Sequence, residues 1–525
     1  MIVDFQTFEE GAEIETDLCV VGAGAAGITI AREFAGSGIS ICLVESGGLD
    51  FEPETQALYE GENLGLPYFD LDVSRLRFFG GTTNHWSGWS GPLNEIDFQV
   101  RPWVPHSGWP ITKRDLDPYY ERAQPVCGLG PYVYDERVWS LLKMKAPALD
   151  PERVAVRFWQ FSPPLNFGEA YRSELRKADN VRVLLHANVT NIQTNETAST
   201  VAYLDLRTLE GKTGRITAKV FVVACGGIEN ARLLLLSDRV EPMGLGNRHD
   251  LVGRFFMEHP SIRCGVIAAR DPYDLLDTYG KHWYKRVPFL PGLCTGDATQ
   301  VREQVLNSGS KIFYEADPDS GTNAAKKILN KLAKGKMPDD LGDKIWKVMT
   351  DLDDVAVNAY RRFVEGKGTI AAPKLIYLDS NSEQAPNPDS RVMLSEKRDA
   401  LGLNRANLDW RLSALDKRSL RVMTEKIGME FGRLNLGRVR LEDWLLEEGM
   451  DWGPDLIGGH HHMGTTRMSD DPRQGVVDGH CRVNGMENLY IAGSSVFPTG
   501  GYMNPTLTIV ALALRLADHL KTRFA

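Results

Sequence analysis

The clearest pattern of hydrophobic positions lies near the N-terminus, across residues 17–48. The apolar run 18–21 is short and sharply bounded, which is typical of a buried parallel strand. Small residues follow, and apolar positions then recur with helical spacing through 28–34. A second apolar run, 39–44, ends at Glu45. The pattern predicts a strand, a tight turn, a helix and a second strand, in that order.

Further along the chain, alternating and continuous apolar runs predict more β structure. Residues 181–195 and 199–224 have the character of strands, and the second stretch is a hairpin-like pair. Its last strand ends at Ala224, before small residues and a helix predicted over 229–236. A strand that ends in small residues before a helix indicates a backbone lying close to a bound cofactor.

Residues 265–455 have a different pattern of hydrophobic positions, in which short β-like runs surround a helical block at about 322–364. Five lysines form a basic face on this block: Lys326, Lys327, Lys331, Lys334 and Lys336. Such a face is more often solvated than bound to a membrane surface or a partner helix, and we favour the solvated interpretation.

The C-terminal part returns to tight motifs. Three consecutive histidines at 460–462 precede a strand that ends at Gly493, and a glycine-rich turn then leads into a last helix. Pro505, followed by Thr506, fits the first turn of that helix, because the missing N–H of proline costs nothing there. The N-terminus of the helix should therefore point at whatever Asn504 faces.

The first turn has the composition of a dinucleotide-binding fingerprint. Gly22 permits the tight turn, Gly24 lets the backbone approach a pyrophosphate, and Gly27 brings helix and strand close. Glu45, about twenty residues beyond the turn, is placed to accept from ribose hydroxyls. The residues of this predicted cofactor site are Gly22, Gly24, Ala25, Ala26, Gly27 and Glu45. A glycine turn that serves packing alone is the alternative; the complete order of strand, turn, helix, strand and acid favours the nucleotide site.

Composition and charge narrow the class of protein. A chain of 525 residues with 42% hydrophobic and 25% charged residues is ordinary for a globular protein with a large core. A formal charge of −10 argues against a nucleic-acid partner, which normally requires a basic excess. No apolar run is long enough for a transmembrane helix, and the N-terminal residues lack the basic and apolar segments of a signal peptide.

Seven scattered cysteines without paired spacing predict reduced thiols in a cytoplasmic protein, with neither a zinc site nor a disulfide framework. Export together with a partner that carries the signal would leave the same pattern and stays an alternative. Within the helix at 229–236, we predict that Asn230 and Arg232 are surface or capping residues.

Four blocks together resemble the glucose–methanol–choline (GMC) family of flavin oxidoreductases. They are the N-terminal fingerprint, GGTTNHW at 80–86, HHHMGTTRM at 460–468 and NLYIAGSSVFPTGGYMNPTLT at 488–508. The likeness also covers 252–260, whereas the centre of the chain is less diagnostic. The resemblance implies an α/β fold, with a discontinuous Rossmann-like FAD-binding domain and an α+β substrate domain that contains an antiparallel sheet. We assign 1–90, 180–260 and 465–525 to the first domain, and 91–179 and 261–464 to the second.

The resemblance also implies the catalytic pair. The family's His-x-x-Gly-Thr pattern falls on His461, and its second catalytic position falls on Asn504. These two side chains are expected to flank the carbinol of an alcohol in front of the flavin. A neutral imidazole is a suitable base near pH 7, while hydride leaves carbon for flavin N5. Consecutive histidines without an acidic or cysteine cluster are a poor metal site, and we predict no metal.

The loop at 77–91 is rich in Gly, Thr, Ser and aromatic residues and is expected to lie against the flavin. Its spacing resembles that of family members whose flavin is attached through a histidine, so His85 is either bonded to FAD or packed beside it. Ser87 is a candidate hydrogen-bonding neighbour of the flavin. The remaining predicted cofactor contacts are Gly81, Thr82, Asn84, Ala224, Gly493, Asn504, Pro505 and Thr506.

The implied activity is oxidation of an alcohol, in particular a sugar or glycoside hydroxyl, with O₂ or another electron acceptor. Two alternatives stay open: a dehydrogenase large subunit that works with a partner protein, and a non-redox FAD-containing lyase. Oligomerisation is compatible with the sequence, and no motif identifies the substrate.

Overall fold

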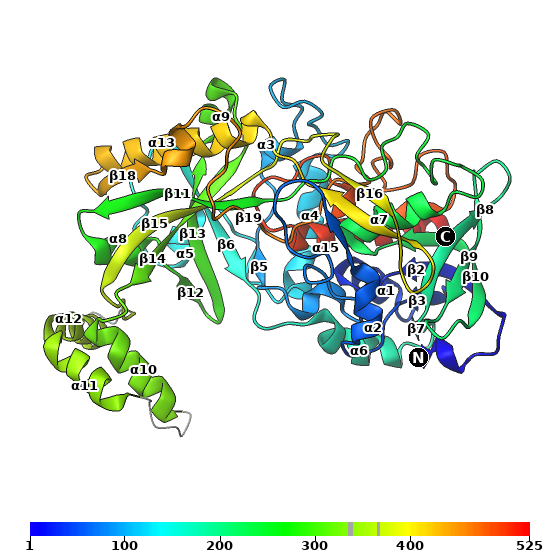
Figure 1. Cartoon of the computed structure of the whole chain (residues 1–525), viewed down its shortest axis with the longest axis horizontal. Helices are drawn as coiled ribbons and strands as arrows, with labels where there is room; N and C mark the ends of the chain where they lie inside the picture. The colour runs from blue at the N-terminus through cyan, green and yellow to red at the C-terminus, as the bar shows by residue number, and fades with distance from the viewer. Residues whose placement is uncertain (334–339, 365–367, 525) are drawn as a thin grey trace.

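A computed structural model describes residues 1–333, 340–364 and 368–524. Lys334 and Lys336 of the predicted basic face lie outside the described residues. The described chain is built around two large sheets that lie on opposite sides of the molecule (Figure 1).

The first sheet has eight strands in the order β1-β7-β3-β2-β10-β9-β8, with β20 paired to β10. Its strands are β1 (Ile2–Asp4), β2 (Ala12–Val21), β3 (Ile41–Val44), β7 (Val181–Leu185), β8 (Asn188–Thr194), β9 (Val201–Arg207), β10 (Thr213–Val223) and β20 (Leu489–Ile491). The pairings among β1, β7, β3, β2, β10 and β20 are parallel, whereas β8, β9 and β10 pair antiparallel. The chain therefore returns to one sheet from three separated regions of sequence.

Strand β2 shows why the sequence folds this way. Its first half alternates, with Ile14 and Thr16 buried between more exposed neighbours. After the half-buried Asp17, the strand is buried from Leu18 to Val21. A strand covered on both faces needs a continuous apolar run, which is what this half supplies.

Helices cover both faces of the parallel sheet. They are α1 (Ala25–Phe34), α4 (Lys113–Val126), α6 (Phe167–Lys177), α7 (Gly226–Leu236) and α15 (Thr506–Phe524). Helix α4 begins with a capping box in which Thr112 and Asp115 bond each other's backbone N–H. It continues through Pro118 and Pro125 to its end at Val126.

The second sheet has nine strands in the order β18-β11-β15-β14-β13-β6-β5, with β12 paired to β13 and β19 to β11, and every pairing in it is antiparallel. Its strands are β5 (Trp89–Ser90), β6 (Val154–Phe161), β11 (Pro260–Ala269), β12 (His282–Tyr284), β13 (Val287–Thr295), β14 (Ser308–Ala316), β15 (Pro373–Ser382), β18 (Gly437–Leu441) and β19 (Ile457–Gly458). Helix α13 (Ala414–Arg433) packs along one face of this sheet (Figure 1). The predicted fold class, α/β with an additional antiparallel sheet, is confirmed; the proposed domain boundaries stay a prediction.

Short elements complete the chain. A three-stranded sheet is formed by β16 (Arg391–Arg398), β17 (Asn404–Asp409) and β4 (Gly61–Asn63). The short helices are α2 (Pro53–Gln56), α3 (Glu95–Phe98), α5 (Arg137–Leu141), α8 (Pro272–Thr278), α9 (Asp297–Glu303) and α14 (Asp443–Leu446). One-turn 3₁₀ helices lie at Phe5–Thr7, Ala57–Tyr59, Gly81–Asn84 and Ser494–Val496.

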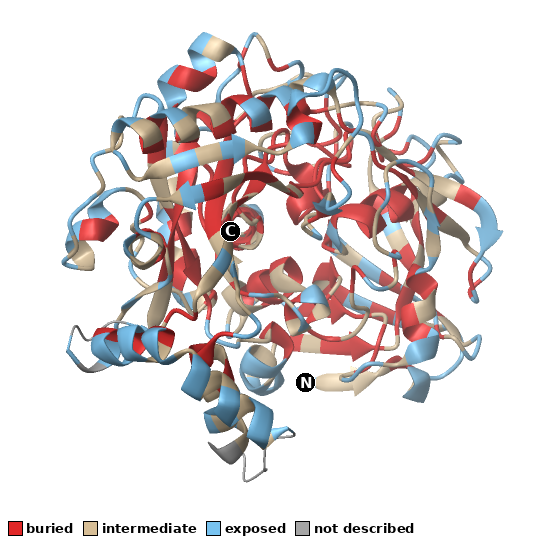
Figure 2. Cartoon of the chain, turned by 60° about the vertical axis from the view of Figure 1, so that its left-hand side comes forward, coloured by how far each residue is buried: buried red, intermediate tan, exposed pale blue. Residues whose placement is uncertain are grey.

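The predicted helical block forms a separate three-helix appendage that projects from the antiparallel sheet (Figure 1). Its helices are α10 (Gly321–Ala333), α11 (Leu341–Thr350) and α12 (Leu352–Phe363). The appendage is inserted between β14 and β15, whose ends still pair at Ala316 and Pro373. Much of its surface is exposed (Figure 2), including the apolar side chains of Trp346 and Met349.

Candidate active site

A cavity of about 610 Å³ lies where the carboxyl ends of the parallel strands meet. Its wall includes the residues that directly follow β2, β3 and β10, and the start of α15. Ligands of open α/β sheets bind at this edge, because loops and helix N-termini converge there. The cavity is therefore the candidate site.

Most of the predicted site residues are brought together in this wall. They are Gly22, Gly24, Ala25, Ala26, Glu45, Gly81, Thr82, His85, Ser87, Ala224, His461, Gly493, Asn504, Pro505 and Thr506. Gly27 and Asn84 lie behind the wall. The Asn84 side chain instead donates to the backbone carbonyl of Phe79, at 3.1 Å.

The glycine turn leaves no room for side chains at two positions. A Cβ on Gly27 would stand 1.9 Å from the carbonyl oxygen of Gly22, and a Cβ on Gly22 would stand 2.6 Å from that of Ala224. Gly22 also has φ +100°, which favours glycine. A Cβ on Gly24 would meet nothing within 4 Å, so this glycine faces open space in the cavity. Exposed backbone at a helix N-terminus is suited to a pyrophosphate.

Glu45 ties the end of β3 to this turn. One carboxylate oxygen accepts from the N–H of Ala23 at 3.0 Å, and the other accepts from the N–H of Gly47, also at 3.0 Å. The carboxylate is buried yet lies in the cavity wall, where a ribose would be within its reach.

The three consecutive histidines point to three different partners. His460 stacks on Phe69 with ring centroids 4.1 Å apart. His462 lies 2.9 Å from the hydroxyl of Tyr68. His461 alone pairs with Asn504, whose amide nitrogen Nδ2 is 3.0 Å from His461 Nε2. The backbone bends at His460, where φ is +59°, so this segment is not a regular strand and the three rings reach different partners.

The surroundings of His461 keep its imidazole neutral. Burial lowers the pKa of His461 well below its ordinary value, and His259 and His462 add to the effect. Asn504 Oδ1 is buried and has no hydrogen-bond partner within the described residues. An orphaned acceptor beside a neutral imidazole suits a ligand that carries a hydroxyl group.

Residues 17–244 match a family model described as FAD dependent oxidoreductase, and residues 386–513 match one described as GMC oxidoreductase. The two matches contain the glycine turn at one end and the His461–Asn504 pair at the other. The chain is similar to the GMC oxidoreductases. It is an FAD-dependent enzyme of the class that acts on CH–OH groups.

Curated relatives match this chain over nearly its whole length. The 6'''-hydroxyparomomycin C oxidase of Streptomyces lividus is 28% identical over 96% of this chain and 92% of that protein. The fructose dehydrogenase large subunit of Gluconobacter japonicus is 22% identical over 96% of this chain and 97% of that protein. A crystal structure of pyridoxine 4-oxidase from Mesorbium loti shares the fold, with a TM-score of 0.57 at 16% identity over 97% of this chain and 99% of that one.

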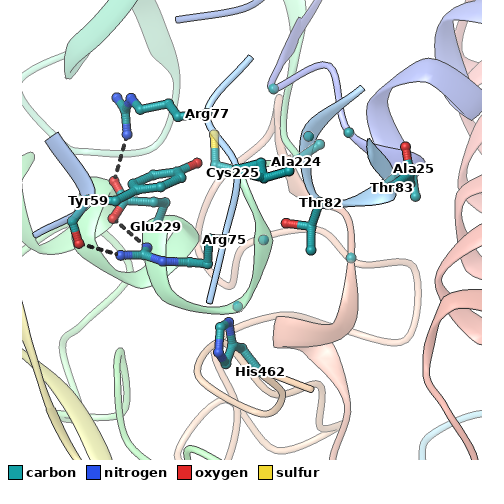
Figure 3. A pocket seen from close by; sticks show the side chains of 18 of the residues that line it. Ala25, Tyr59, Arg75, Arg77, Thr82, Thr83, Ala224, Cys225, Glu229 and His462 are labelled. Atoms are coloured by element: carbon teal, nitrogen blue, oxygen red, sulfur yellow. Dashed lines mark hydrogen bonds and ion pairs between the residues drawn. The ribbon is translucent and has the colours of Figure 1, made fainter. Parts of the chain in front are cut away.

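The cavity also contains an ion-pair cluster that the sequence did not reveal (Figure 3). Arg75 and Arg77 contact the Glu229 carboxylate at 2.9 and 3.4 Å, and Arg232 contacts it at 3.2 Å. Burial alone would raise the pKa of Glu229, but the guanidinium groups of Arg232, Arg75 and Arg77 lower it to about 2. The cluster places fixed positive charge in the cavity wall. Residues this far apart in sequence form no motif.

Asn230 and Arg232 correct the prediction that they are surface or capping residues. Both are buried, at 0% and 3% exposure. Asn230 accepts from the N–H of Cys225 at 2.7 Å, and it donates to the carbonyl of Ala492 at 3.1 Å. It therefore joins the end of β10 to the end of β20, both of which border the cavity.

His85 follows the 3₁₀ helix Gly81–Asn84 and lies in the cavity wall, where its side chain is exposed and partial desolvation lowers its pKa. Attachment of FAD through His85 stays a prediction, as does the contact with Ser87. Within the described residues, no group of three His, Cys, Asp or Glu side chains is arranged to hold a metal ion. No helix in the described part of the chain is long and apolar enough to cross a bilayer.

Proposed function

We propose that this enzyme oxidises a hydroxyl group of a sugar or glycoside, with His461 as the base and Asn504 as the group that orients the hydroxyl. The observation that carries the proposal is the 3.0 Å pair between His461 Nε2 and Asn504 Nδ2 in the cavity wall. Bound FAD supplies the acceptor for the hydride that leaves the carbinol carbon.

FAD fits the residues present. The open turn at Gly24 and the N-terminus of α1 suit its pyrophosphate, and Glu45 suits its ribose. The N-terminus of α15, which begins after Pro505, offers unpaired N–H groups and positive dipole to the flavin end. Together these residues line one continuous cavity.

The proton of the hydroxyl is taken by His461. Because the folded protein holds this imidazole neutral, it has a lone pair available at neutral pH. Asn504 neither gains nor loses a proton in this range, so it can hold the substrate oxygen throughout the reaction. Its unpartnered Oδ1 leaves capacity for a second contact with a polyhydroxylated substrate.

The sugar class is supported by two relatives, one named for a hydroxylated paromomycin and the other for fructose. The test is anaerobic mixing of the FAD-loaded enzyme with sugars, aminoglycosides and simple diols. We expect bleaching of the flavin by members of the sugar set and not by the simple diols. No bleaching by any alcohol would favour the lyase alternative, and repeating the assay in air with and without artificial acceptors distinguishes oxidase from dehydrogenase.

The variant His461→Ala tests the base directly. General-base catalysis contributes about 10²–10⁴-fold in rate, so flavin reduction should slow by that factor while FAD content is retained. Asn504→Ala is the companion variant and should weaken substrate binding as well as rate. An unchanged reduction rate in His461→Ala would contradict the proposed role.

A cytoplasmic location is supported by the cysteines. The seven thiols are free, and six of them are buried. Reduced cysteines without partners are usual in a reducing compartment.

A further inference from the structure

We propose that His259 is a positioning residue that keeps the proton of His461 on Nδ1 and so leaves Nε2 as the basic nitrogen. The proposal rests on the proposed function, in which His461 is the base. His259 was not predicted as a site residue, although it lies within the segment 252–260 that resembles the family.

The backbone holds the two imidazoles together. Met257 and Met463 form an antiparallel bridge in which each N–H donates to the other's carbonyl at 3.0 Å. The carboxylate of Glu258 accepts from the N–H of His259 and from the N–H of His461, both at 2.8 Å. One side chain therefore fixes the backbone of both histidines.

The proton of His259 is located by a neighbour that can only accept. His259 Nε2 lies 3.3 Å from the carbonyl oxygen of Gly500, so this nitrogen must carry the hydrogen. Burial lowers the pKa of His259 to about 4, which makes the ring neutral near pH 7. A neutral ring with hydrogen on Nε2 has its lone pair on Nδ1.

The lone pair of His259 then determines the tautomer of His461. The two Nδ1 atoms are 2.9 Å apart, and the rings meet edge to face at 75°. Since His259 Nδ1 can only accept, His461 Nδ1 must donate. The hydrogen of neutral His461 is thereby placed on Nδ1, and its lone pair lies on Nε2.

The other end of His461 agrees with this assignment. Asn504 Nδ2 is a donor, and it lies 3.0 Å from His461 Nε2. If the hydrogen of His461 were on Nε2, two donors would face each other there, and two lone pairs would face each other at His259. Only one placement of the hydrogens therefore satisfies all the hydrogen bonds that link Gly500, His259, His461 and Asn504.

The tautomer is measured directly by NMR of holoenzyme with ¹⁵N-labelled histidine. The signals of His461 are identified as those lost in His461→Ala. We expect a protonated Nδ1 and an unprotonated Nε2 at pH 7. Hydrogen on Nε2 of His461 in the wild-type enzyme would overturn the proposal, and this readout depends neither on activity nor on any variant of His259.

A matched pair of variants tests the consequence for the reaction. His259→Asn can still present an oxygen to His461 Nδ1, whereas His259→Leu fills similar space without an acceptor. At saturating substrate we expect flavin reduction within about fivefold of wild type for His259→Asn and about 100-fold slower for His259→Leu, which is within the range of lost base catalysis.

Equal rates in the two variants would overturn the proposal, because packing alone would then explain His259. If His461→Ala reduces flavin normally, the proposed function fails, whatever the tautomer. If His461→Ala is impaired but His259→Leu is not, the proposed function stands and only the positioning role of His259 fails. Should neither His259 variant retain FAD, the NMR result on the wild-type enzyme decides.

Discussion

His461 combines two effects that are usually separate: a depressed pKa and a fixed hydrogen-bond partner on each ring nitrogen. The titratable side chains that act on it are His259, His460, His462 and Lys311, each of which disfavours its protonation. Burial is the largest cause. A base that stays neutral in mildly acidic solution follows from this environment.

The pH dependence of flavin reduction should show this directly. An ordinary histidine, with a pKa of about 6.5, would be about 90% protonated at pH 5.5 and the rate would fall about tenfold. Because the folded pKa of His461 is lowered, its lone pair persists below pH 6.5 and is lost only as pH falls through the lower value. We expect the anaerobic reduction rate at pH 5.5 to stay within about threefold of that at pH 7.5.

Glu258 provides the control for this measurement. Burial raises the pKa of its carboxyl to about 7, so it takes up a proton in the same range. The variant Glu258→Gln holds this position neutral at all pH values. A bend near pH 7 in the plot of reduction rate against pH belongs to the Glu258 carboxyl if it disappears in Glu258→Gln. A bend near pH 6.5 that persists in this variant would mean that His461 titrates normally.

Sequence patterns grouped individual residues where chemistry and spacing coincide. His461 and Asn504 belong to compact motifs, and the structure brings them within hydrogen-bond distance. Their roles stay predictions. His259 and the Glu229 cluster were not found, because a lone histidine or arginine has no spacing signal and its partners come from distant elements.

Among the elements, the turn between β2 and α1 was the most predictable, because backbone contacts require glycine at Gly22 and Gly27. Element boundaries were less accurate: α7 begins at Gly226, three residues before the predicted start. Gly226 has φ +87°, and a left-handed glycine at a helix start is not distinguishable in sequence from a loop glycine. The antiparallel sheet was recognised only as short runs, because its pairings join distant segments.

Two alanine substitutions separate the packing role of this turn from its ligand role. Gly27→Ala places a Cβ against the Gly22 carbonyl and should lower the free energy of unfolding by about 1–3 kcal/mol. Gly24→Ala meets no protein atom but enters the cavity, so it should weaken FAD binding about tenfold or more. Thermal melts of the apoprotein and FAD titrations measure the two effects; a destabilised Gly24→Ala apoprotein would contradict this division.

At the scale of the whole molecule, the loop after α3 is joined to the end of the antiparallel sheet by a buried ion pair. Arg101 and Glu383 are 1% and 0% exposed, and Arg101 Nη1 donates to Glu383 at 2.8 Å. The same carboxylate accepts from the N–H of Asn307 at 3.1 Å. Removing one partner of such a buried pair destabilises the folded protein more than removing both charges.

Replacing Arg101 alone should therefore be costly. Arg101→Met leaves an uncompensated buried charge and should lower the free energy of unfolding by about 3–5 kcal/mol. The double variant Arg101→Met, Glu383→Gln removes both charges, keeps an acceptor for Asn307 and should recover most of this loss. Urea unfolding at a fixed FAD concentration measures both, and a double variant no more stable than the single one would contradict the explanation.

The appendage α10–α12 leaves and re-enters the antiparallel sheet at adjacent residues, Ala316 and Pro373, and none of its described residues lines the cavity. Replacing 320–369 by a short turn should thus leave flavin reduction and FAD content unchanged. The melting temperature should fall by a few degrees, because the Arg361–Asp277 contact is lost. Loss of FAD in the shortened chain would show that the sheet depends on it. The insertion point should therefore accept other inserted domains: a reporter or affinity module whose ends lie close together can replace the appendage without reaching the cavity.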